Sequence, residues 1–208
     1  MTRRSAATLT LCLALFPAHA HAGAQQEEAL AASVQAALQH SVADQAPEQA
    51  VFSNTEEANL WLTEMSRRLE KRIPEQTQRL DFLNAVHYEA RRAGLDPQMV
   101  LGLIEVESGF RKYAVSKAGA RGYMQVMPFW MRLIGTPDHN LFHLRTNLRY
   151  GCTILRHYLD IEQGNLFRAL GRYNGSLGKP DYPNRVRASW QRWQQPMQTR
   201  LPHTTTPG

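Results

Sequence analysis

Two glutamates at the end of one apolar segment are the residues whose type and position could carry out chemistry. Glu105 and Glu107 close the run from Met99 to Glu107, which otherwise consists almost entirely of apolar residues. A helix over this run has hardly any polar face and should be central and buried. A carboxylate at its end is partly desolvated and faces the negative end of the helix dipole, and both effects raise its pKa. A carboxylic acid that stays protonated near neutral pH can act as a general acid.

The apolar pattern alone does not choose between these two glutamates. Around a helix, Glu105 and Glu107 lie about 200° apart, so each has apolar neighbours. Either side chain could instead point into solvent from the helix end. The choice between them therefore depends on the surrounding motifs.

The elements that must position these residues are helical wherever the sequence shows a period. Asp96 and Pro97 supply an N-cap and a first-turn proline for the apolar helix. We expect helices over residues 25–40, from a capping box at 53–56 until Pro74, through 83–90 with an end at Gly94, from Pro97 to Glu107, through 148–159 with an end at Gly164, over 166–173 with an end at Asn174-Gly175, and from about 183 to 195. No alternation predicts a sheet, and only a short hairpin within 174–182 is allowed. The fold class is therefore all-α.

The first 22 residues have the character of a secretory signal peptide. Arg3 and Arg4 give a basic start, an apolar run follows from Ala6 to Phe16, and small residues up to Ala22 offer cleavage points. The apolar run is shorter than the roughly 20 residues that span a bilayer as a helix. We therefore expect export to the periplasm. A lipoprotein anchored at Cys12 is the poorer alternative, because the small residue that usually precedes such a cysteine is absent.

The rest of the chain divides into an extension, one domain and a tail. We expect a helical N-terminal extension over 23–75, a helical catalytic domain over 76–195 and a disordered Thr- and Pro-rich tail over 196–208. Cys152 is the one cysteine left after signal cleavage, so no internal disulfide can form and stability must come from an ordinary core. The length suits a single core.

Charge and histidine spacing argue against several classes of partner. The net charge of +6 would fall to about +4 without Arg3 and Arg4, an excess that suits an anionic polymer and equally suits plain solvation. The basic residues are dispersed and carry no nucleic-acid-binding motif, so we expect no nucleic acid. The histidines lack the spacing of a metal site, so we expect neither a metal nor a cofactor.

Three blocks of sequence carry a family resemblance. They are Glu107-Ser108-Gly109-Phe110, the segment Gly-Ala-Arg-Gly-Tyr-Met-Gln-Val-Met-Pro over 119–128, and Arg172-Tyr173-Asn174-Gly175. Together they resemble the soluble lytic transglycosylase family, whose pattern is Glu-Ser, then Gly-Leu-Met-Gln-x-Met-Pro, then Tyr-Asn followed closely by Gly. The resemblance extends over residues 94–186. It departs from the pattern at Tyr123, at Arg172 and in the direct succession of Asn174 and Gly175.

The resemblance implies a lysozyme-like helical domain that cleaves the MurNAc-GlcNAc β-1,4 bond of peptidoglycan without hydrolysis. It makes Glu107 the single general acid and base, and the products would carry 1,6-anhydro-MurNAc ends. The residues that it places in contact with the glycan are Ser116, Gln125, Met127, Tyr173 and Asn174. Its tyrosine, at position 173 here, would approach the catalytic carboxylate.

Two other functions stay open from the sequence. A hydrolase of the goose-type lysozyme kind would share the fold and the glutamate but would let water attack. A non-catalytic glycan-binding or scaffold protein would grip the glycan through the same groove. We expect a monomer, and we hypothesise that residues 23–72 dock to a secretion, conjugation or pilus assembly.

Overall fold

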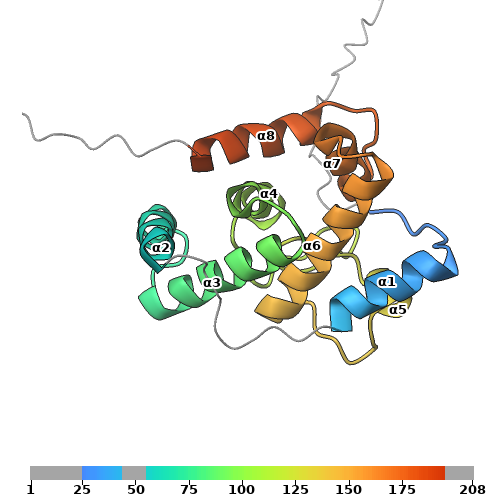
Figure 1. Ribbon diagram of the computed structural model, residues 1–208, viewed down its shortest axis with the longest axis horizontal. Helices are drawn as coiled ribbons and strands as arrows, with labels where there is room; N and C mark the ends of the chain where they lie inside the picture. Colours follow the sequence, from blue (N-terminus) through green and yellow to red (C-terminus); the bar gives the residue numbers. More distant parts are fainter. Residues whose placement is uncertain (1–24, 44–54, 195–208) are drawn as a thin grey trace, which may run out of the picture.

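Helices form every regular element of the described chain. The computed structural model describes residues 25–43 and 55–194, and within them it has eight helices and no strand (Figure 1). The helices are α1 (Ala32–Ala43), α2 (Thr55–Leu69), α3 (Gln76–Arg92), α4 (Pro97–Ser108), α5 (Phe129–Ile134), α6 (Leu144–Ile161), α7 (Leu166–Asn174) and α8 (Asp181–Gln194). The all-α prediction is confirmed. The predicted signal peptide, Ser53 of the capping box and the predicted tail lie outside the described residues.

The most apolar helix, α4, lies at the centre of the fold. Its start follows the sequence signal, because the Asp96 carboxylate accepts a 2.9 Å hydrogen bond from the Met99 amide and Pro97 occupies the first turn. Its end is set by Gly109, which has a φ of 58°. The helix is buried on nearly all sides and packs against α3 and α8. This burial accounts for the missing polar face.

Close approach of α4 and α8 depends on a glycine. A Cβ atom at Gly102 would lie 2.7 Å from the backbone nitrogen of Trp190, so no larger residue fits without a shift of the two helices. The α4–α8 contact is the most extensive between any two described helices. It brings the beginning of α8 to the end of α4, where Glu107 lies.

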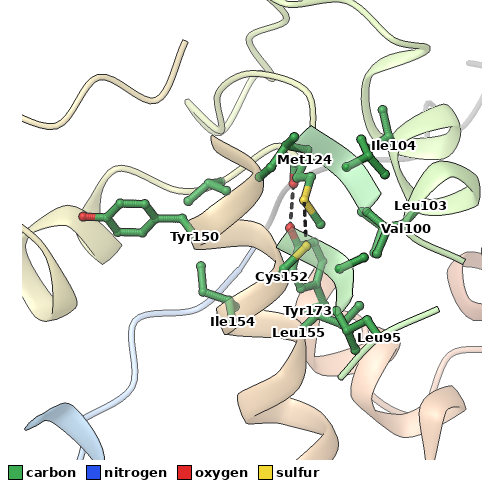
Figure 2. Packing of buried hydrophobic residues seen from close by; sticks show 14 of the residues in the cluster. Leu95, Val100, Leu103, Ile104, Met124, Tyr150, Cys152, Ile154, Leu155 and Tyr173 are labelled. Atoms are coloured by element: carbon green, nitrogen blue, oxygen red, sulfur yellow. Dashed lines mark hydrogen bonds between the residues drawn. The ribbon is translucent and has the colours of Figure 1, made fainter. Parts of the chain in front are cut away.

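Helix α6 packs its apolar face against the segment that precedes α5. Gly151 lets this happen, because a Cβ there would lie 2.4 Å from the Met124 sulfur. Cys152 is buried beside the same methionine (Figure 2). The helix ends near Gly164, as predicted. Helix α7 then begins after Asn165, whose side chain accepts a hydrogen bond from the Arg168 amide.

The isolated β-bridges of the described chain lie in the loop between α4 and α5. Isolated bridges join Val115 to Arg121 and Arg121 to Val126, whereas residues 175–180, where a hairpin was allowed, form turns. Asn147 of α6 fixes this loop: its Oδ1 accepts from the Met124 amide at 2.8 Å, and its Nδ2 donates to the Arg121 carbonyl at 2.9 Å. A buried amide therefore holds the loop against the helical core.

The N-terminal extension packs onto the domain. Helix α1 lies beside α5 and α6 (Figure 1), and the Gln35 amide donates a 2.8 Å hydrogen bond to the Leu133 carbonyl. It begins at Ala32, so the first seven residues of the helix expected over 25–40 are not helical. Helix α5 was not expected. Of the helices in residues 25–43 and 55–194, none combines the length and apolar character needed to cross a bilayer.

Candidate active site

Glu107 is a buried acid, and one of its oxygens has no hydrogen-bond partner in the described part of the chain. Its side chain lies at the end of α4 and is 6% exposed. The Tyr182 hydroxyl donates a 2.5 Å hydrogen bond to Oε1, while Oε2 accepts no hydrogen bond from a described residue. Burial raises the pKa of Glu107 from 4.5 to about 7, although the Tyr182 hydrogen bond and the Arg185 charge act to lower it. The carboxyl can therefore carry a proton near neutral pH and still release it.

Glu105 has the opposite environment. Its Oε2 accepts hydrogen bonds from Ser189 at 2.5 Å, from Trp193 Nε1 at 3.1 Å and from Arg192 at 3.1 Å. Burial acts to raise the pKa of Glu105, but these donors outweigh it and hold the pKa below its ordinary value. The side chain is thus a charged anchor for α8. The structure separates two glutamates that the apolar pattern left equivalent.

Two buried tyrosines lie close to Glu107 and differ in what they bond. Tyr173, at the end of α7, donates a 2.7 Å hydrogen bond to the Met124 carbonyl (Figure 2). Burial raises the pKa of its phenol well above the ordinary value, and the charge of Glu107 raises it further. The direct bond to Glu107 comes from Tyr182 of α8, a residue that the sequence analysis did not single out.

Gln125 and Ser116 both brace the loop between α4 and α5. The buried Gln125 amide donates to the Ala114 carbonyl at 3.1 Å and to the Gly122 carbonyl at 2.9 Å, and its backbone has a φ of 49°. The Ser116 hydroxyl accepts a 3.1 Å hydrogen bond from the Ala120 amide. These contacts give the loop a fixed shape.

Met127 and Asn174 complete the set of residues expected at the site. Met127 is half-buried at the end of the same loop, and Asn174 ends α7 immediately after Tyr173. Asn174 is 5% exposed, and its Nδ2 has no hydrogen-bond partner among the described residues. An amide that is buried and unpaired can donate to a ligand.

Gln25 is a second residue that the sequence analysis missed. Its side-chain Oε1 accepts from the Met127 amide at 3.2 Å and from Trp130 Nε1 at 3.0 Å, and the residue is 4% exposed. Burial dominates the raised pKa of Tyr173, and the Gln25 side chain acts in the opposite direction. The extension therefore reaches the segment that carries Met127. No sequence signal linked these positions, because they lie more than a hundred residues apart.

Comparison with known proteins identifies the family of this domain. The described chain forms a helical domain in which the buried acid Glu107 precedes a braced loop. The model of the transglycosylase SLT domain family matches residues 84–193, which is more than half of the chain. The protein therefore belongs to the transglycosylase SLT domain family.

Several curated relatives share parts of this region. The chain is 33% identical over 99 residues to membrane-bound lytic murein transglycosylase C of Haemophilus ducreyi, a match that covers 44% of this chain and 24% of the relative. It is 30% identical over 103 residues to the transglycosylase of Enterobacteria phage PRD1, covering 50% and 38%. A 47-residue stretch is 51% identical to the transglycosylase C of Actinobacillus pleuropneumoniae, covering 23% and 13%. The chain thus spans well under two thirds of these relatives.

One solved structure is also similar. It is an inactive mutant of the lytic transglycosylase Slt from Pseudomonas aeruginosa, with a TM-score of 0.41 and 23% sequence identity. The match covers 66% of this chain and 25% of that one.

Proposed function

We propose that the protein is a peptidoglycan lytic transglycosylase that cleaves the β-1,4 bond between MurNAc and GlcNAc and leaves 1,6-anhydro-MurNAc ends. The observation that carries this proposal is the state of Glu107: a buried carboxyl with a pKa of about 7, whose Oε1 accepts a hydrogen bond from Tyr182 and whose Oε2 has no partner among the described residues. Membership in the transglycosylase SLT domain family supports it.

In the first step Glu107 acts as an acid. The protonated carboxyl donates its proton to the glycosidic oxygen, and the bond from that oxygen to C1 of MurNAc breaks. Glu107 is left as a carboxylate. The Tyr182 hydroxyl then becomes more important, because a hydrogen bond donated to a carboxylate stabilises the charged form.

In the second step the same carboxylate acts as a base. It removes the proton of the C6 hydroxyl of MurNAc, and this oxygen bonds to C1 to form the anhydro ring. The proton that Glu107 gave up is thereby restored and no water is consumed. Because the nucleophile belongs to the same sugar, its effective concentration is high without a second carboxylate. The groups that act on the pKa of Glu107 are Tyr182 and Arg185, and neither could replace the second carboxylate of an ordinary glycosidase.

The groove roles follow from the positions of the remaining residues. The half-buried Met127 side chain and the Asn174 amide, which has no hydrogen-bond partner among the described residues, can contact the sugars. Gln125 and Ser116 give the loop its shape. Tyr173 supports the loop through the Met124 carbonyl.

Export and partners also belong to this proposal. We include cleavage of the 1–22 signal peptide and action in the periplasm as a monomer, in keeping with a peptidoglycan substrate. The docking of residues 23–72 to a secretion, conjugation or pilus assembly stays a hypothesis. Deletion of 23–72 with every partner interaction intact would contradict it, although packing of α1 on the domain requires a folding check on that variant.

Clearing of purified peptidoglycan tests the activity. The mature protein should release soluble fragments, and Glu107→Gln should be folded but inactive. Glu105→Gln is the matched control, two residues away on the same helix, and should keep most of the activity because Glu105 anchors α8 and does not react. Release by Glu107→Gln at the wild-type rate would contradict the proposal, whereas reducing MurNAc ends from the wild type would make the protein a hydrolase.

A further inference from the structure

The loop that follows Glu107 presents a basic surface. From Ser108 to Pro137 the sequence has no aspartate or glutamate. The loop between α4 and α5 carries four cations in this stretch: Arg111, Lys112, Lys117 and Arg121. Three of these side chains are exposed and that of Arg121 is half-buried. No described acidic residue forms an ion pair with any of them. The positive charge of this surface is therefore not neutralised within the described chain.

Aromatic rings lie among these cations. Tyr113 is 71% exposed, and its ring centroid lies 5.8 Å from that of Phe142. The Lys112 ammonium lies 5.3 Å from the Tyr113 centroid, and the Arg121 guanidinium lies 5.9 Å from the Phe142 centroid. Contacts at these distances hold the cations near the ring faces. The surface, which we call the basic–aromatic surface, thus offers charge and apolar area together.

This surface is fixed to the proposed groove. The Ala114 carbonyl, next to Tyr113, accepts hydrogen bonds from the Gln125 amide at 3.1 Å and from the Gly122 backbone at 2.9 Å. Arg121 pairs with Val126 through two backbone hydrogen bonds of 2.9 and 3.0 Å. These bonds fix the position of the basic–aromatic surface relative to Gln125 and Met127, so a substrate bound at these two residues would lie next to it.

We propose that the basic–aromatic surface binds the stem peptide that MurNAc carries. This inference rests on the proposed function. The sugars of the strand are largely uncharged, so they do not account for four cations that have no acidic partner among the described residues. The stem peptide has free carboxylates that complement Lys112 and Lys117, and its small apolar side chains can pack on Tyr113. The surface then makes the enzyme favour peptide-bearing strands over bare glycan.

Binding measured without turnover tests this proposal. In a Glu107→Gln background, Lys112→Ala/Lys117→Ala is compared with the charge-keeping Lys112→Arg/Lys117→Arg. The ligands are soluble uncross-linked glycan strands with their stem peptides and the same strands stripped of peptides by an amidase. The alanine pair should weaken binding of peptide-bearing strands by about three- to tenfold, as expected for two exposed ion pairs. Binding of stripped strands should not change, and the arginine pair should bind like its parent.

The outcomes separate this proposal from the activity itself. An equal loss for both kinds of strand, or no loss for either, would overturn the role of the surface. The preference of the parent for peptide-bearing strands should also shrink as salt is raised, because exposed charges are screened. Absence of cleavage by the wild type would count against the transglycosylase function alone, since the binding comparison does not depend on turnover.

Discussion

Environment, not residue type, distinguishes the two glutamates of α4. Glu105 is charged because Ser189, Trp193 and Arg192 donate to it, and Glu107 is protonatable because it is buried with one donor, Tyr182. A general acid needs the second arrangement, since its pKa must lie near the working pH. Helix α4 positions both glutamates, and hydrogen bonds from α8 act on the pKa of each.

Removal of the Tyr182 hydroxyl should raise the pKa of Glu107 further. The hydrogen bond favours the carboxylate, so Tyr182→Phe favours the acid form. The basic limb of the pH–rate profile should move upward by about one pH unit, as expected for a bond to a charged group. The rate should fall as well, because the carboxylate formed in the first step loses a donor.

Tyr173→Phe is the matched control for this change. It removes a hydrogen bond to the Met124 carbonyl, so it should lower the melting temperature and leave the basic limb where it is. A basic limb that stays in place in Tyr182→Phe, or moves downward, would contradict the role assigned to Tyr182.

Glu107 should make the fold less stable as the pH rises. Its pKa is about 7 in the folded protein against 4.5 ordinarily, so the folded state binds the proton more tightly. The stability this provides is complete below about pH 4.5 and is lost between pH 4.5 and 7. Glu107→Gln cannot titrate, so its unfolding free energy relative to wild type should rise by up to about 3 kcal/mol over that window.

Urea unfolding at pH 4.5 and pH 8 measures this difference. Glu105→Gln serves as the comparison, because the pKa of Glu105 is lowered and its contribution is present at higher pH and lost on acidification. That contribution is lost only as the pH falls below about 4.5, so the difference of Glu105→Gln from wild type should stay nearly constant between pH 4.5 and pH 8. The same pH trend in both variants would show that Glu107 is not selectively protonated.

At the scale of elements, capping residues in the sequence predicted where individual helices begin or end. Asp96 and Pro97 predicted the start of α4, and the Asn174-Gly175 pair predicted the end of α7, where Gly175 has a φ of 70°. Helix α5 escaped prediction because its six residues are too few to show a period. Tyr182 and Gln25 escaped because their bonds join residues 75 and more than a hundred positions apart, which no local pattern records.

Loss of the Gln25 side chain should loosen the contact between the extension and the domain. Gln25→Leu leaves the Met127 amide and Trp130 Nε1 without their acceptor, and a buried donor left unpaired costs about 1–3 kcal/mol. The melting temperature should therefore fall by several degrees. Gln26→Leu, at the exposed neighbouring residue, should leave it nearly unchanged. Equal melting temperatures for the two variants would show that the Gln25 contacts contribute nothing.

At the scale of the whole molecule, the packed structure begins before the first residue that the family model matches. The match covers residues 84–193, while α1 and Gln25 precede it and pack against α5, α6 and Trp130. The expected division at residue 75 followed Pro74, which ends a predicted helix. It could not show these contacts, because they depend on the three-dimensional arrangement of the helices.

The central claim is that one buried glutamate cleaves the glycan without water. Mass spectrometry of the soluble muropeptides released from purified peptidoglycan by the mature protein tests it most directly, with Glu107→Gln beside it. We predict anhydromuramyl products, each one water lighter than the hydrolytic product, and none from the variant. Reducing MurNAc ends from the wild type, or anhydromuramyl products from Glu107→Gln, would contradict the account.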